Sequence, residues 1–157
     1  DDGQTIAGLS VLHTPGHAND HLCFSRPDGI LFTGDHVMSW NSSIVNPPDG
    51  NMSDYCAQLS RLLDRSDKAY LPGHGPRLDE PKAYVQRLYE NRMRRETEIL
   101  AHLSRKPDTI INIAVSVYKK IDPLIAKAAE RNVAAHLEKL SREDRAVQDG
   151  NFWHAVT

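Results

Sequence analysis

The sequence predicts a mixed fold of the α+β and α/β classes, a strand-rich layer over residues 1–80 followed by a helical winged-helix module over residues 81–157. Residues 1–81 hold eight of the nine Gly and seven of the nine Pro. The charge changes at the same place: residues 1–81 carry 5 Lys and Arg against 11 Asp and Glu, whereas residues 82–157 carry 14 against 10. A domain boundary is therefore expected near residues 79–81.

In the first part, β-branched and apolar runs predict short strands separated by turns. Pro27-Asp28-Gly29 predicts a hairpin turn between two of them. Residues 41–52, rich in Asn, Ser, Pro and Gly, predict a long loop of a kind that is often functional. Ser53 is expected to cap a helix that runs to about Asp64. The strands are expected at residues 5–12, 21–25, 30–33 and 68–71.

The second part predicts three helices and a hairpin. Apolar residues at helical spacing follow Pro81 to about residue 104, and Asp108 or Thr109 can cap a second helix over residues 110–119. A third helix is expected after Pro123, to about residue 140. Asp149-Gly150 lies between two strand-like runs, which predicts a tight hairpin. This order of elements is that of a winged helix.

The composition narrows the class of protein. The chain is 39% hydrophobic and 25% charged with a net charge of −2, which excludes a disordered chain and a collagen-like chain. Cys23 and Cys56 stand in apolar contexts without CxxC spacing, which predicts buried reduced thiols and a cytoplasmic protein. No apolar run approaches the roughly 18 residues that span a membrane.

Five of the eight His lie in the first 74 residues. His17, Asp35 and His74 each stand in a Gly-containing turn directly after a predicted strand, where a stiff backbone holds a side chain at the rim of the sheet. Imidazole and carboxylate are ligands that Zn²⁺ accepts. The pattern therefore indicates a metal site, although a single His beside Gly is more often a solvated or capping residue.

Three motifs carry a family resemblance. His13-Thr-Pro-Gly-His17, Phe32-Thr-Gly-Asp35-His36 and Pro72-Gly-His74-Gly75 resemble, in order, the last three metal motifs of the metallo-β-lactamase-fold hydrolases. The C-terminal part resembles the winged-helix tail of the branch that contains lactamase-β-2-like proteins and many uncharacterised bacterial hydrolases. The resemblance implies the C-terminal half of an αβ/βα sandwich followed by a winged helix.

The same resemblance implies the role of each residue. His17 would bind one divalent ion, His74 a second, and Asp35 would bridge them, with zinc expected and manganese or iron also suited to such ligands. Trp40 and the loop 41–50 would border the substrate mouth, with a packed surface Trp as the open alternative. Three further His match near-site positions, namely His13, His21 and His36. They are expected to support the ligands or to pack beside them, with direct ligation as the alternative.

One expected motif is missing. The His-x-His-x-Asp-His string that the resemblance places upstream does not occur in this sequence, which leaves two protein ligands per metal where a catalytic zinc needs about three. We therefore expect this chain alone to be inactive and, since it begins with Asp, to be a C-terminal piece. An apolar sheet face should then meet the missing N-terminal half or a second copy; its members are Ile6, Leu9, Val11, Leu22, Phe24, Ile30 and Phe32.

The expected activity is hydrolysis by a metal-bound hydroxide. Ester, thioester, amide and phosphodiester bonds all suit this chemistry, so the substrate could be a small molecule or RNA. A winged-helix nucleic-acid-binding module is a competing hypothesis, but ten acidic residues are interleaved with the basic ones and the pI is about 6.5. A structural relative without metals is a third.

Overall fold

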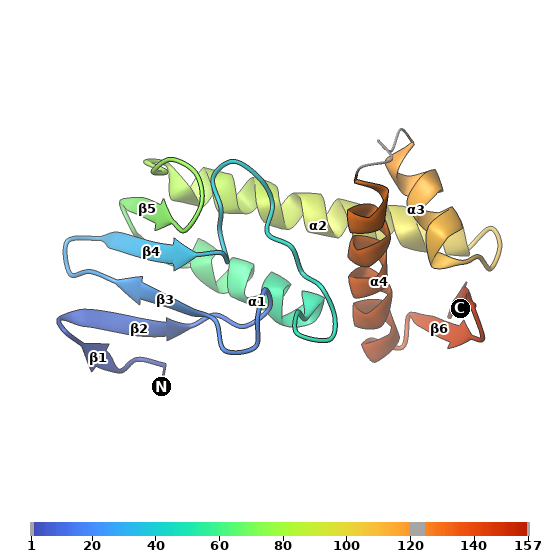
Figure 1. Cartoon of the computed structure of the whole chain (residues 1–157), viewed down its shortest axis with the longest axis horizontal. Helices are drawn as coiled ribbons and strands as arrows, with labels where there is room; N and C mark the ends of the chain where they lie inside the picture. Colours follow the sequence, from blue (N-terminus) through green and yellow to red (C-terminus); the bar gives the residue numbers. More distant parts are fainter. Residues whose placement is uncertain (1, 120–124, 157) are drawn as a thin grey trace. The chain divides into compact units, whose positions relative to one another are not determined.

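A computed structural model describes residues 2–119 and 125–156 and divides into two compact units, Asp1–Glu90 and Asn91–Thr157 (Figure 1). Pro123 and the predicted start of the third helix lie outside the described residues. No described helix has the length and apolar character needed to cross a membrane. The elements are β1 (Thr5–Ile6), β2 (Leu9–His13), β3 (Leu22–Ser25), β4 (Ile30–Gly34), α1 (Met52–Leu63), β5 (Ala69–Pro72), α2 (Pro81–Leu103), α3 (Ile110–Tyr118), α4 (Ala126–Arg142), β6 (Ala146–Asp149) and β7 (Phe152–Ala155).

The first unit contains one sheet of order β1-β2-β3-β4-β5. Strands β1 to β4 pair antiparallel, while β5 pairs parallel to β4. Because β2 and β4 both run antiparallel to β3, the strands β2, β4 and β5 all point the same way. Their carboxyl ends therefore lie at one edge of the sheet.

Both outer strands of this sheet are short or covered. Strand β1 has two residues, Thr5 and Ile6. On the other side, Tyr70 of β5 forms an antiparallel bridge with Leu78, with backbone N–O distances of 2.8 and 3.0 Å in the two directions. The segment that follows β5 thus occupies part of the hydrogen-bonding edge of that strand.

One face of the sheet forms the core of the first unit. Leu12 and Cys23 are register partners, as are Leu31 and Tyr70, and all four are almost fully buried. Helix α1 lies behind the sheet in Figure 1, and its apolar side is buried as well. As predicted, both cysteines are buried free thiols.

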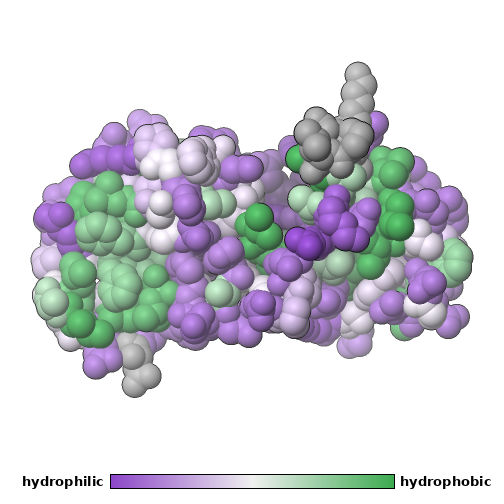
Figure 2. Space-filling view, in the orientation of Figure 1, coloured by the Kyte–Doolittle hydropathy of each residue, from purple (hydrophilic) through white to green (hydrophobic). Residues whose placement is uncertain are grey.

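The opposite face of the sheet is apolar and partly open to solvent. Phe24, Phe32 and Leu71 are register partners across three strands and are half-buried. Ile6 and Leu22 are exposed, whereas Val11 is buried. Figure 2 shows hydrophobic side chains gathered over this sheet. The apolar face predicted from the sequence is therefore present, with Val11 as the member that is already covered.

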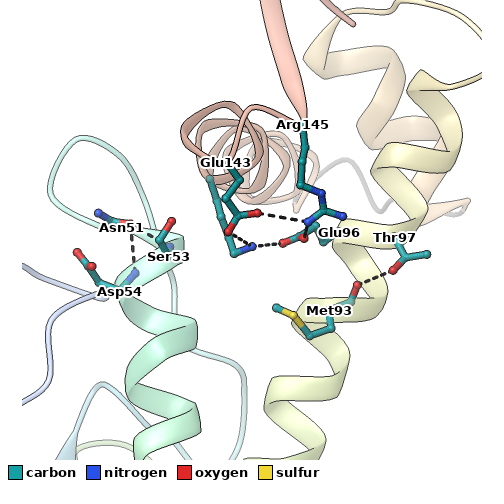
Figure 3. A network of polar contacts seen from close by, with 9 residues as sticks. Asn51, Ser53, Asp54, Met93, Glu96, Thr97, Glu143 and Arg145 are labelled. Carbon is teal, nitrogen blue, oxygen red and sulfur yellow. Dashed lines mark hydrogen bonds and ion pairs between the residues drawn. The ribbon is translucent and has the colours of Figure 1, made fainter. Parts of the chain in front are cut away.

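Two local predictions in this unit were wrong. The expected strand over residues 5–12 is interrupted because Ala7 and Gly8 adopt positive φ angles of 50° and 80°, which turns the chain into a β1–β2 hairpin. The cap of α1 is Asn51 rather than Ser53, because the Asn51 side chain accepts hydrogen bonds from the backbone N–H groups of residues 53 and 54 at 2.9 and 3.3 Å (Figure 3).

The second unit is a winged helix with its own core. Thr109, one of the two expected caps, precedes α3, and its side-chain hydroxyl accepts a hydrogen bond from the backbone N–H of Asn112. Asp108 and Trp153 exchange two backbone hydrogen bonds of 3.1 and 2.9 Å, which attach the β6–β7 hairpin to the start of α3. The core is built from buried apolar residues of α2, α3, α4 and the hairpin, among them Ile99, Ile113, Val133, Leu137, Leu140 and Trp153.

A buried carboxylate connects the helices of this unit (Figure 3). Glu96 of α2 is 5% exposed. One of its oxygens accepts from Lys139 Nζ of α4 at 2.6 Å, and the other accepts from Arg145, next to β6, at 2.5 Å. Glu143 also pairs with both cations. Such a pair is costly to break, because the cation that remains has already been withdrawn from water.

We predict that Glu96→Gln lowers the free energy of unfolding by about 3 kcal/mol, because Lys139 then stays buried without its closest carboxylate. Urea unfolding measures the change. Glu98→Gln is the matched control, because the Glu98 side chain pairs with Arg95 but stays 41% exposed, and ion pairs open to solvent contribute about 0–1 kcal/mol. Equal losses in the two variants would contradict the importance of the buried network.

Candidate metal centre

The three predicted ligands come together at one edge of the sheet. His17 follows β2, Asp35 follows β4 and His74 follows β5, so each stands just beyond a carboxyl strand end. His17 Nε2 lies 3.9 Å from Asp35 Oδ2, and His74 Nε2 lies 3.5 Å from Asp35 Oδ1. Each oxygen of one carboxylate thus faces a different imidazole.

These distances suit shared ions better than direct hydrogen bonds. Both exceed the roughly 3.2 Å limit of an N–H···O hydrogen bond. Two ligands bound tetrahedrally at zinc, each about 2.1 Å from it, stand about 3.4 Å apart. The donor set therefore fits two metal ions bridged by Asp35. Among residues 2–119 and 125–156, no three His, Cys, Asp or Glu side chains converge around a single ion position.

The His17 ring has the orientation of a metal ligand. Its Nδ1 lies 2.6 Å from the carbonyl oxygen of Ile44. Because a carbonyl only accepts, Nδ1 carries a proton and donates it, and Nε2 is the nitrogen that faces Asp35. Ligating histidines are commonly held in this way by a backbone carbonyl.

His21 supports the candidate bridge from behind. Its Nε2 accepts a 3.2 Å hydrogen bond from the backbone N–H of Asp35, and its Nδ1 lies 2.8 Å from Thr14 Oγ1. Since Nε2 accepts, the ring proton is on Nδ1 and is donated to Thr14. Burial, and then the neighbouring His17, lower the pKa of His21. Both nitrogens are thus engaged within the protein.

The two other near-site histidines differ from each other. His36 is fully buried, its ring 4.8 Å from that of Tyr55, and burial lowers its pKa to about 3, so that it is neutral at physiological pH. His13 is exposed, and its Nε2 lies 2.9 Å from the carbonyl oxygen of Asn19. The roles of these residues toward a metal stay predictions.

Trp40 is exposed and adjoins a candidate ligand. Its ring lies parallel to that of His74, with 5.9 Å between centroids and 7° between planes. The indole is thus held at the site while most of its surface, 69%, faces solvent. That Trp40 borders the substrate mouth stays a prediction.

Sequence reasoning missed one residue that holds the candidate bridge. Ser43 Oγ donates to the backbone oxygens of Asp35 and His36 at 2.5 and 2.9 Å. Its only signal in the sequence is membership of the long loop, where serine is a common residue.

Close backbone approaches explain two glycines of the motifs. A Cβ atom at Gly73 would lie 2.9 Å from Asp35 Oδ1, so the turn after β5 can pass the carboxylate only without a side chain. Gly16 has a φ of 136°, and a Cβ there would overlap the backbone N and Cα of Tyr55 in α1. The turn that carries His17 is therefore pressed against the start of α1.

Comparison with known proteins places the fold. A family described as "Beta-lactamase associated winged helix domain" matches residues 109–153. A solved metallo-beta-lactamase family protein from Thermus thermophilus superposes with a TM-score of 0.83 at 25% identity, over 99% of this chain and 53% of that one.

Two curated relatives are similar to this chain over more than four fifths of its length. "Beta-lactamase-like protein 2 homolog" of Drosophila melanogaster is 30% identical over 88% of this chain and 47% of its own length. "Atrochrysone carboxyl ACP thioesterase" of Aspergillus chevalieri is 28% identical over 82% of this chain and 44% of its own length. The chain thus spans about half the length of the curated relatives it matches.

We predict that Gly16→Ala lowers the free energy of unfolding by about 2–4 kcal/mol, through strain at positive φ and overlap with Tyr55. Gly8→Ala is the matched control, because Gly8 has a φ of 80° but nothing within 4 Å of an added Cβ. It should cost only about 1 kcal/mol. Similar midpoint shifts for the two variants in urea would refute the overlap.

Proposed function

Because this chain belongs to the metallo-β-lactamase superfamily with a C-terminal winged helix and is similar to the C-terminal portion of its members, we propose that it forms the C-terminal half of a metal-dependent hydrolase. The observation that carries the proposal is the Asp35 carboxylate, which presents one oxygen to His17 and the other to His74.

In this proposal His17 and Asp35 would hold one ion, while His74 and Asp35 would hold the other. Zinc fits imidazole and carboxylate ligands, and manganese or iron would suit them as well. When bound, two such ions supply a water of lowered pKa and stabilise the charge that develops on the substrate oxygen. Ester, thioester, amide and phosphodiester substrates fall within this chemistry.

Hydrogen bonds within this chain hold two of the candidate ligands in place. The Ile44 carbonyl fixes the His17 ring, and the backbone of Asp35 is held on both sides, its N–H by His21 and its carbonyl by Ser43. Ligands locked by surrounding hydrogen bonds need little reorganisation when they bind an ion.

The proposal requires a complementary part. One imidazole and one carboxylate oxygen per ion are fewer than the roughly three protein ligands of a catalytic zinc. We assign the remaining ligands to a His-x-His-x-Asp-His motif on an N-terminal half. That half would pack on the open apolar face of the sheet, which includes Leu22, Phe24 and Phe32. A second copy of the chain on the same face is the alternative.

We propose a structural role for the winged-helix unit. Lys127 and Arg142 on α4 pair with Glu130 and Glu138, at 3.1 and 3.8 Å, so acidic neighbours offset these cations. Phosphate binding depends on cations that are free to replace counterions. This pairing favours the hydrolase proposal over a nucleic-acid-binding module.

Zinc titration by calorimetry tests the site. We expect the chain alone to bind zinc with micromolar or weaker affinity and to hydrolyse no ester, because each ion has two protein ligands. Asp35→Ala should abolish the binding heat at both positions, and His17→Ala should abolish it at one.

The control for this titration is His154→Gln, which removes an imidazole from the wing and should leave the heat unchanged. Zinc heat that persists in Asp35→Ala would refute the bridged site and favour a metal-free relative. Sub-micromolar binding together with ester hydrolysis by the chain alone would refute the need for a complementary half.

A further inference from the structure

One loop contacts all three candidate ligands. We call residues 38–46 the contact loop. Its Ile44 carbonyl accepts from His17, and its Ser43 hydroxyl donates to the carbonyl of Asp35. The ring of Trp40 lies over His74. The contact loop is thus part of the wall of the candidate site.

The contact loop is fixed at its start. The Tyr84 hydroxyl donates to the carbonyl of Met38 at 2.8 Å, and Thr33 Oγ1 donates to the carbonyl of Val37 at 2.8 Å. The backbone N–H of Ser39 donates to the carbonyl of His74 at 3.2 Å. These bonds give the side chains that follow a defined place beside the ligands.

Two large apolar side chains on this loop remain uncovered. Trp40 is 69% exposed and Ile44 is 61% exposed, more than any other large apolar side chain in the described part of the chain. Removing apolar surface from water is favourable at roughly 25 cal/mol per Å². Because the loop that carries both side chains contacts the candidate metal ligands, we expect the group that covers them to be part of the substrate.

The surrounding charge indicates the nature of that group. Residues 27–60 contain no Lys or Arg but include four Asp, one of which is the candidate bridge. Arg26 and Arg61, which flank this stretch, are paired with Asp28 and Asp2. A polyanion such as RNA depends on free cations along its path, which this segment does not offer. An uncharged apolar group suits the contact loop better.

We propose that Trp40 and Ile44 bind the apolar acyl group of a neutral ester or thioester and so determine the substrate class of the site. This inference rests on the proposed hydrolase function. The Ile44 carbonyl bonds to His17 and the Trp40 ring stacks on His74, and these two imidazoles face the two oxygens of Asp35. An acyl chain bound to this loop would therefore lie beside the candidate ligands that the loop contacts.

Tryptophan fluorescence tests this on the chain itself, without metal or turnover. Trp153→Phe leaves Trp40 as the only tryptophan, since the sequence contains two. In this background we expect octanoyl-N-acetylcysteamine to change the emission of Trp40 saturably, with an affinity at least tenfold above that of acetyl-N-acetylcysteamine. Adding Ile44→Ser should weaken octanoyl binding about fivefold.

The matched control is Ile111→Ser, which removes an equally exposed isoleucine from α3 and should leave octanoyl binding unchanged. Equal affinity for the two thioesters, no saturable change, or saturable binding of a short oligouridylate alone would overturn the proposal. Because binding is read without zinc, failure of the zinc titration and failure of this experiment are separate results.

Discussion

Strand β5 pairs parallel to β4, with Leu31 opposite Tyr70 and Phe32 opposite Leu71, and the candidate site depends on this pairing. A parallel pair needs a crossover connection, because the chain must return to the starting edge before the second strand begins. Here the crossover comprises the contact loop and α1. The segment that the topology requires is therefore also the segment that reaches back to His17, Asp35 and His74. The parallel pairing of β4 and β5 thus accounts both for the position of the candidate ligands and for the loop that lies beside them.

Most of the fold could be predicted from the sequence, because strand length, turn residues and helical spacing are local properties. The hairpin at Ala7-Gly8 could not, since a non-glycine residue at positive φ leaves no clear pattern. The three turns that carry the candidate ligands could also be located from the sequence, because each places a ligand-type residue in a turn that contains glycine. To predict that these turns lie close together, the order of the strands in the sheet must be known, and a single sequence does not give that order.

The finer features of the site were beyond sequence reasoning for a different reason. The bond between His17 and the Ile44 carbonyl joins residues 27 positions apart and depends on how an irregular loop folds back. His21 looked like His13 and His36 in the sequence, yet it alone of these three bonds to the backbone of Asp35. Such assignments follow from the direction of a ring nitrogen, which composition and spacing do not encode.

The edges of the sheet restrict how any further chain can join it. Strand β1 offers only two residues for pairing, and the bridge between Tyr70 and Leu78 occupies part of the edge of β5. An added strand would find little continuous backbone to hydrogen-bond on either side. Association through the apolar face would therefore be governed by side-chain packing between layers. The strength of such an association would depend on the size of a few side chains on this face. It would also not lead to aggregation by the addition of strand after strand at a sheet edge.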